Sequence, residues 1–167
     1  MPKKRVVLFL VEGVNDKTAL AVPLEKLITT ENIKFDITDK NGDITSRYSE
    51  KSIAARVGDC VKKHCEEYKY KREDFAEVVL LIDMDGAYIN AEAILKDESC
   101  IDPYYNSHNI LYWHPDRLYE SHIMKQQNLN RLVSLPYVLK TIPFSVYFFS
   151  SNLDHVIVEM RNENAEK

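Results

Sequence analysis

Apolar runs recur along this chain, and polar turn residues separate them. Residues 6–11 (VVLFLV) and 78–82 (VVLLI) contain no polar side chain. Uninterrupted runs of this length are typical of strands that are buried on both faces of a sheet. Residues 33–38 alternate in polarity and predict a further strand, and residues 145–149 (SVYFF) predict another buried one.

Helical spacing of apolar residues follows most of these runs. It predicts a helix that follows Gly13, continues to Ile28 and contains Pro23, and a second helix over about 50–68. It also predicts a short helix at 91–95 and a stretch over 118–139 that is mostly helical until Pro136. Strands and helices therefore alternate along the first half of the chain. This order predicts an α/β fold with a mainly parallel sheet and helices on both faces.

The region between the third and last predicted strands has a different pattern. We expect residues 87–144 to form an α+β insert, in which residues 103–105 and 110–113 make a hairpin around a polar turn. The rest of the chain belongs to one domain spanning residues 1–167. The chain ends soon after the last strand, where a covering helix is expected, which favours a C-terminally incomplete piece of a longer protein.

Composition narrows the class of protein. The 167 residues are 45% hydrophobic and 29% charged, as in a globular domain, and no apolar stretch is long enough to span a bilayer. The three cysteines form no paired motif, which favours reduced thiols and a cytoplasmic protein. The lack of a membrane-spanning stretch predicts that the protein has no membrane partner. The formal charge of −4 argues against a protein that coats nucleic acid generally.

Acidic residues stand at the ends of two of the apolar runs. Glu12-Gly13 follows the run of residues 6–11, and Asp83-Met84-Asp85-Gly86 follows the run of residues 78–82. Open α/β sheets place their sites at the carboxyl ends of strands, so these acids are expected to converge, with Asp16 facing the same crevice. Crowded carboxylates repel one another and need a cation, and hard oxygen ligands favour Mg²⁺, Mn²⁺ or Ca²⁺ over zinc.

Two further groups of side chains, one basic and one aromatic, each allow two interpretations of their role. The end of the second helix is basic, and these cations either complement the helix dipole or face phosphates of nucleic acid. They are Lys62, Lys63, Lys69, Lys71 and Arg72. The aromatic residues of the insert either form a small core or stack on bases. They are Tyr104, Tyr105, Tyr112 and Trp113.

The pattern of strand, Glu-Gly, and a second strand ending in Asp-x-Asp about 70 residues later resembles the Toprim fold of topoisomerases, primases and related nucleases. The sequence LVEGVNDKTAL is most similar to the branch that includes overcoming-lysogenisation-defect nucleases and other bacterial anti-phage defence nucleases. The resemblance covers residues 6–86 well and 145–155 loosely. It implies Mg²⁺- or Mn²⁺-dependent cleavage of a phosphodiester in DNA or RNA.

The resemblance also implies roles for particular residues. Glu12 matches the acid/base or metal-binding glutamate, Asp83 and Asp85 match the metal-binding acids, and Asp16 matches the second acid of the nuclease branch. A later polar segment near the family's site has a loose counterpart here, in Ser151, Asn152 and Asp154. His155, which also follows the last predicted strand, is a candidate base. The chain has no P-loop motif, so any ATPase or regulatory partner is expected on a separate protein.

Two other classes fit parts of the pattern. The segment LLIDMDG resembles the opening motif of haloacid-dehalogenase-type phosphatases, in which the first Asp is a nucleophile. That family places this strand first, whereas here it comes third, and Glu12 is left without a role. The other class is a non-catalytic Toprim-like module that binds a partner. A cleavage assay separates this binding module from a nuclease.

Overall fold

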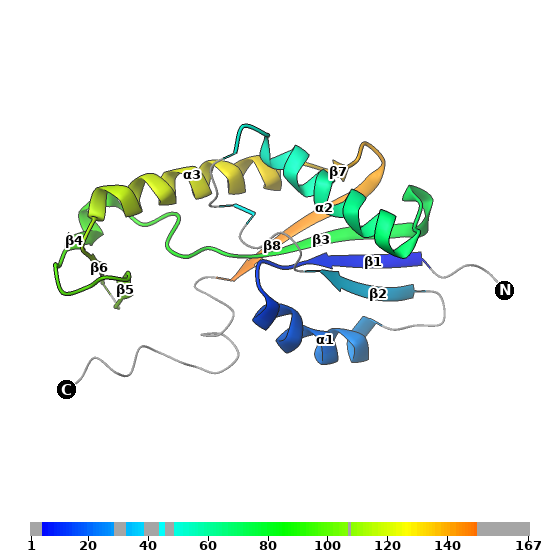
Figure 1. The fold of residues 1–167 in the computed structure, drawn as a ribbon, viewed down its shortest axis with the longest axis horizontal. Helices are drawn as coiled ribbons and strands as arrows, with labels where there is room; N and C mark the ends of the chain where they lie inside the picture. The colour runs from blue at the N-terminus through cyan, green and yellow to red at the C-terminus, as the bar shows by residue number, and fades with distance from the viewer. Residues whose placement is uncertain (1–4, 29–32, 39–43, 46–48, 107, 150–167) are drawn as a thin grey trace. The chain divides into compact units, whose positions relative to one another are not determined.

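The computed structural model describes residues 5–28, 33–38, 44–45, 49–106 and 108–149, without the side chains of 14–16, 25, 27–28 and 33–38. The chain divides into two compact units, which are described separately. The first unit comprises Met1–Ile82 and Asn128–Phe148, and the second comprises Asp83–Gln127 and Phe149–Lys167. The grey segments of Figure 1 lie outside this description.

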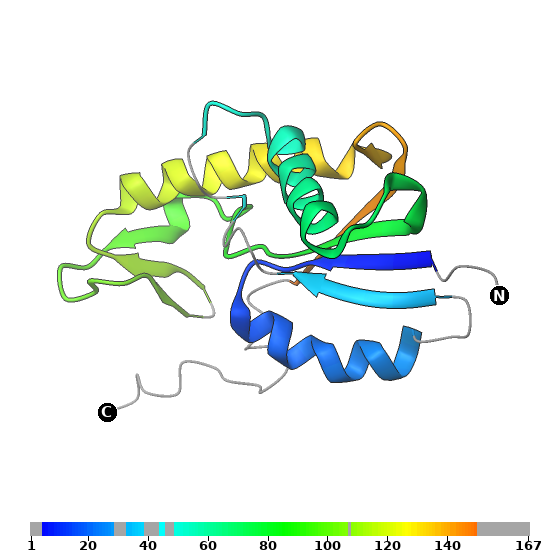
Figure 2. The ribbon, with the colours of Figure 1, turned by 45° about the vertical axis from the view of Figure 1, so that its right-hand side comes forward.

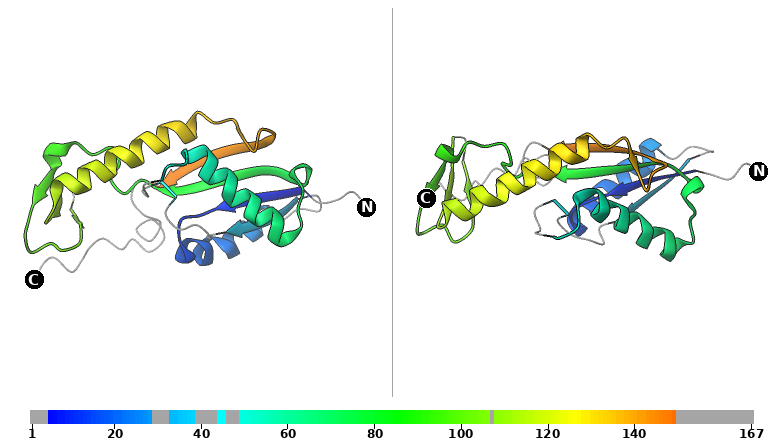
Figure 3. Two further views of the ribbon diagram at one scale, coloured as in Figure 1. Left: turned by 45° about the horizontal axis from the view of Figure 1, so that its top comes forward. Right: turned by 90° about the horizontal axis from the view of Figure 1, so that it is seen from above.

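The first unit is built on a mixed five-stranded sheet in the order β2-β1-β3-β8-β7. Its strands are β1 (Arg5–Leu10), β2 (Ile33–Thr38), β3 (Phe75–Asp83), β7 (Tyr137–Val138) and β8 (Ile142–Phe149). β1 pairs in parallel with both β2 and β3, whereas β7 and β8 form an antiparallel hairpin. Figure 3 (left) shows β1, β3 and β8 running in the same direction. The predicted α/β class is confirmed, as is the adjacency of the first and third predicted strands.

Burial explains why β1 and β3 lie in the middle of the sheet. Val6 and the run Leu8–Leu10 are buried in β1, and Val78–Leu80 with Ile82 are buried in β3. Consecutive residues of a strand face opposite sides, so runs of this kind require cover on both faces. The register places Leu10 opposite Leu80, so the carboxyl ends of β1 and β3 lie at the same edge.

Two helices provide this cover. α1 (Val14–Ile28) joins β1 to β2, and α2 (Ile53–Tyr68) joins β2 to β3 in the reverse direction across the sheet. Right-handed crossovers in opposite directions place their helices on opposite faces, and Figure 2 shows the strands between α1 and α2. The short 3₁₀ helix η1 (Arg72–Asp74) leads into β3.

The ends of α2 follow from local chemistry. Ser52 caps the helix, because its hydroxyl accepts a hydrogen bond from the backbone N–H of Ala55 at 3.3 Å. This cap starts α2 at Ile53, three residues after the predicted start. At the other end Lys69 takes a left-handed conformation, and its N–H donates to the carbonyl of Cys65. The predicted end at Tyr68 is confirmed.

The β7–β8 hairpin packs on α2 at an unusual turn. Leu139 and Lys140 have φ values of 49° and 75°, which are left-handed conformations without glycine. The Leu139 side chain comes so close to Gly58 of α2 that a Cβ there would lie 3.1 Å from Leu139 Cδ2. β8 begins at Ile142, earlier than the predicted residue 145, because Ile142 and Pro143 pair with β7.

The second unit contains a three-stranded sheet in the order β4-β6-β5. β5 (Tyr104–Tyr105) and β6 (Ile110–Tyr112) are antiparallel, which confirms the predicted hairpin. The helix predicted over 91–95 is wrong beyond a single 3₁₀ turn, η2 (Ala91–Ala93), because Ile94–Lys96 forms β4 and pairs with β6. Ile94 and Ile110 are the buried apolar residues at this pairing.

The long helix α3 spans Pro115–Val133. The helix ends before Pro136, as predicted, because the chain turns at Leu135, and residues 137–138 form β7. Residues of the expected insert from Asn128 onward group with the first unit, as the end of α3 and the β7–β8 hairpin. None of the helices in the described ranges combines the length and apolar character needed to cross a membrane.

Candidate functional site

Two of the predicted acids stand at the ends of neighbouring parallel strands. Glu12 follows β1 by two residues, and Asp83 is the last residue of β3. Glu12 groups with the first unit, and Asp83 and Asp85 with the second. Both Glu12 and Asp83 are partly exposed, although the strands that lead to them are mostly buried. The sequence prediction that β1 and β3 both end at one edge of the sheet is thus confirmed.

The carboxylate of Glu12 is held by a buried hydroxyl. Thr45 Oγ1 donates a hydrogen bond of 2.8 Å to Glu12 Oε1, and Thr45 is fully buried. The backbone carbonyl of Thr45 in turn accepts a 2.7 Å bond from the Asn128 side chain, which is also buried. This chain of contacts orients Glu12 without adding a charge. Thr45 and Asn128 were missed by the sequence reasoning, because partners 33 and 83 residues away leave no local pattern.

Asp85 occupies a tight turn after β3. Its φ is 43°, and the next residue, Gly86, has a φ of 74°. The N–H of Met84 donates to the Phe149 carbonyl, and that of Ala87 donates to the Met84 carbonyl, at 3.1 and 2.8 Å. A Cβ at Gly86 would lie 3.3 Å from the His122 ring, so this turn requires glycine for both its conformation and its packing.

A buried lysine binds Asp85. Lys125 Nζ lies 2.6 Å from Asp85 Oδ2, and the exposed fractions of these side chains are 2% and 43%. A lysine is almost never fully buried without a partner, so this contact is the most unusual electrostatic feature among the described residues. Sequence reasoning missed Lys125, which reads as one of several polar residues on an amphipathic helix.

Two titratable side chains surround this ion pair in the second unit. His122 is buried, and its Nδ1 atom has no hydrogen-bond partner among the described residues. Burial lowers the pKa of His122, against an opposing effect of Asp85, so the imidazole is neutral at neutral pH. Burial, and secondarily the charge of Asp85, raises the pKa of Tyr105 to about 12. Lys125 is therefore the positive group of this cluster.

The chemistry of the acids fits a hard divalent cation in part. Glu12 and Asp83 supply carboxylate oxygens of the kind that Mg²⁺ and Mn²⁺ prefer. Asp85 fits less well, because one of its oxygens binds an ammonium group. Within the described residues no three His, Cys, Asp or Glu side chains are grouped closely enough to hold a metal. The side chain of Asp16, and residues 151, 152, 154 and 155, lie outside the description.

The predicted basic residues near the end of α2 are exposed. Lys62 and Lys63 precede its last turn, and Lys69, Lys71 and Arg72 follow it. The last turn itself contains no basic residue. His64, between these lysines in sequence, is buried and packs on Tyr68 and Tyr70, with ring centroids 4.5 and 5.8 Å away. These five cations remain candidates for phosphate contact.

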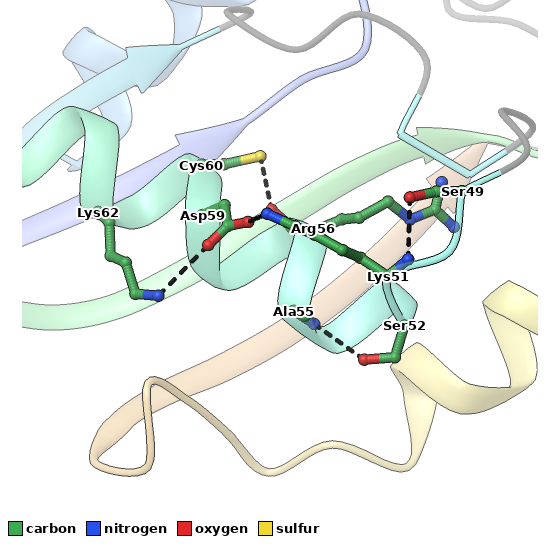
Figure 4. A network of polar contacts seen from close by, with 8 residues as sticks. All are labelled: Ser49, Lys51, Ser52, Ala55, Arg56, Asp59, Cys60 and Lys62. Carbon is green, nitrogen blue, oxygen red and sulfur yellow. Dashed lines mark hydrogen bonds and ion pairs between the residues drawn. The ribbon is translucent and has the colours of Figure 1, made fainter.

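Figure 4 shows a network of polar contacts in the first half of α2 and the residues before it. Asp59 accepts hydrogen bonds from Lys51 at 2.6 Å and from Lys62 at 3.3 Å, and these bonds lower the pKa of Asp59. Both lysines are more than half exposed. Surface ion pairs of this kind contribute little to stability, and they are a useful contrast to the buried pair of Lys125 and Asp85.

Comparison with known proteins adds no relative to this picture. No protein-family model, curated protein or solved structure matches the chain. The class that the fold and these residues define is therefore an α/β protein with acids at the carboxyl ends of two adjacent parallel strands.

Proposed function

We propose that this protein is a metal-dependent nuclease of the Toprim type, which cleaves phosphodiesters of DNA or RNA. The observation that carries the proposal is the parallel pairing of β1 and β3, with Glu12 and Asp83 at their carboxyl ends. Acids in these positions are suited to holding Mg²⁺ or Mn²⁺ at the edge of an α/β sheet. Bacterial anti-phage defence is the setting that the resemblance suggests.

The proposed roles follow from the contacts of each acid. Asp83 binds the metal through its carboxylate. Glu12 either binds the metal or accepts a proton from the attacking water, and the Thr45 hydroxyl keeps its carboxylate oriented. The metal, when bound, supplies positive charge that stabilises the oxygens of the phosphodiester during displacement. Exposed cations of α2 and the segment after it, such as Lys63 and Lys69, are candidates for contacts to the nucleic-acid backbone.

A cleavage assay with matched variants tests the proposal. Plasmid, single-stranded DNA and tRNA are incubated with the purified protein and with Mg²⁺, Mn²⁺ or EDTA. We expect metal-dependent cleavage by the parent protein and a loss of at least about 100-fold with Glu12→Gln or Asp83→Asn. The controls are Glu92→Gln and Asp102→Asn, which make the same chemical changes at exposed positions and should cut like the parent.

The same assay separates the other classes. Cleavage of p-nitrophenyl phosphate without any cleavage of nucleic acid would favour a phosphatase that uses Asp83 as a nucleophile. Metal-independent binding of nucleic acid or protein without any cleavage would favour a non-catalytic module. Equal cleavage by Asp83→Asn and the parent would contradict the nuclease proposal.

A further inference from the structure

A cavity lies in the first unit between the first half of α2 and the β7–β8 hairpin. Its volume is about 400 Å³, and its lining comes from α2, from the turn after α3 and from the hairpin. Every lining residue belongs to the first unit. Proteins bind small molecules in cavities of about 300–1,000 Å³, so this space is large enough for one ring system with a substituent.

The floor of the cavity is apolar. Val57 of α2 and Val138 and Phe144 of the hairpin line it, and all three are buried. Ala54 of α2 also lines the cavity and adds little bulk to it. A floor of this kind favours a ligand with an apolar part, because that part leaves water when it binds.

An exposed aromatic residue lines the same cavity. Tyr137 of β7 is 54% exposed, so much of its ring meets water. A flat ring that stacks on Tyr137 would cover this surface while it contacts the apolar floor. Tyr147 of β8 is 60% exposed but lies outside the lining, so it provides a matched comparison.

Positive charge is in excess at the cavity, although the formal charge of the chain is −4. Lys62, Lys140 and Asp59 line the cavity, and Asp59 is also bound by Lys51 (Figure 4). This group contains three lysines and one carboxylate, an excess of two positive charges. Lys140 is exposed, and no carboxylate among the described residues forms an ion pair with it. The excess favours an anionic ligand.

The turn that carries Lys140 has an uncommon backbone conformation. Leu139 and Lys140 have φ values of 49° and 75°, and within the described ranges no other two consecutive non-glycine residues have positive φ values. Both residues line the cavity. Conformations of this kind cost free energy and are concentrated at ligand-binding and catalytic sites. The backbone therefore supports a binding role for the same turn that supplies the exposed cation.

We propose that this cavity binds a small anion that carries a flat apolar ring, with the ring between Tyr137 and the apolar floor and the anionic group at Lys140. Nucleoside monophosphates and aromatic carboxylates both have this chemistry. The inference goes beyond the proposed function and does not depend on it, because the strand-end acids take no part in the lining.

Calorimetric titration of the whole chain in the presence of EDTA tests the proposal. The probes are AMP, naphthoate, adenosine and inorganic phosphate. We expect AMP or naphthoate to bind at least about tenfold more tightly than adenosine, which lacks the anion, and inorganic phosphate, which lacks the ring. The tighter of AMP and naphthoate identifies the source of the ligand.

Matched variants locate the binding site. Lys140→Gln and Tyr137→Leu should each weaken binding of the tighter probe by at least about threefold. The controls Lys26→Gln and Tyr147→Leu make the same changes at exposed positions outside the cavity and should bind like the parent. Ala54→Met fills part of the cavity with a good helix former and should weaken binding by at least about tenfold.

Several results would overturn the inference. They are no binding of either anionic probe below about 10 mM, equal affinity for AMP and adenosine with none for naphthoate, and parental affinity in both Lys140→Gln and Tyr137→Leu. Circular dichroism checks that each variant is folded, and these two exposed substitutions decide the question if Ala54→Met is not. Because EDTA removes divalent metals and no cleavage is measured, the nuclease proposal can fail while this site stands, and the reverse holds too.

Discussion

Glu12 and Asp85 have the same sequence context but different partners. Each acid follows a buried strand and directly precedes a glycine. Glu12 accepts a hydrogen bond from the hydroxyl of Thr45, whereas Asp85 accepts one from the ammonium of Lys125. A hydrogen bond from a hydroxyl orients a carboxylate, whereas an ammonium also brings a positive charge to it. Similar strand-end acids can therefore have different functions, according to the charge of the buried donor.

The two regions also share a feature. In each the donor is buried and the acid is partly exposed: Thr45 and Lys125 are 0% and 2% exposed, and the Asp85 side chain is 43% exposed. A buried donor has few alternative partners, so it restricts the orientation of the acid. Each acid is thus anchored from the protein side while part of it meets solvent.

The largest effect on stability is expected when only one partner of the ion pair between Lys125 and Asp85 is replaced. Asp85→Asn should lower the free energy of unfolding by about 2–4 kcal/mol, because the buried Lys125 ammonium loses its 2.6 Å contact with a carboxylate. The double variant with Lys125→Met should recover most of this loss. Urea denaturation followed by the fluorescence of Trp113, the single tryptophan, measures both in the second unit.

The exposed ion pair of Lys96 and Glu98 is the matched control for the Asp85 and Lys125 variants. Lys96→Met and Glu98→Gln should leave the free energy of unfolding close to that of the parent, singly or together, because both side chains are mostly exposed. If Asp85→Asn were as mild as Glu98→Gln, the contrast between the buried and the exposed pair would have no energetic meaning.

A smaller effect is expected from the neutral contact at Glu12. Thr45→Val keeps the shape of the side chain but removes the hydroxyl, and it should cost about 1–2 kcal/mol because a charge-assisted hydrogen bond is lost. Thr45→Ser keeps the hydroxyl and should cost less. Thermal unfolding by circular dichroism measures both variants, and equal losses would mean that the methyl group of Thr45 matters more than its bond to Glu12.

The smallest effect is expected at the surface network of α2. Hydrogen bonds from Lys51 and then Lys62 lower the pKa of Asp59, so its stabilising effect is fully present above the ordinary pKa of an aspartate. It is lost as the pH falls through the lowered pKa of the folded state. Melting temperatures of the parent and of Asp59→Asn should differ slightly at neutral pH and converge in acid. A difference that grows in acid would contradict this assignment.

Much of the first unit could be predicted from sequence because its signals are local. The apolar run of residues 78–82 and the helical spacing up to Tyr68 report burial directly, and both elements form where expected. The prediction of a helix over 91–95 was wrong for Ile94–Lys96, because these residues form a strand through pairing with β6 despite their good helix propensity. Tertiary contacts therefore override local propensity in the short elements of the second unit.

The candidate site was predictable only as far as its acids. Glu12, Asp83 and Asp85 are visible because they interrupt apolar runs at glycine turns. Thr45 and Lys125 could not be found, because they lie 33 and 40 positions from their acids in the sequence and have an unremarkable local context. The partner of a strand-end acid thus lies far away in the sequence, where no local pattern reveals it.

The turn between β7 and β8 has a practical consequence for anyone adapting this chain. Leu139 and Lys140 both hold left-handed conformations that glycine would adopt at lower cost. Leu139 is tied to its position, since its side chain fills the space beside Gly58 of α2. Lys140 is exposed, so it is the residue of the turn that can be exchanged for glycine or asparagine without losing the packing against α2. Position 140 is therefore a starting point for raising the stability of the protein, and it lies far in sequence from the acids whose chemistry must be kept.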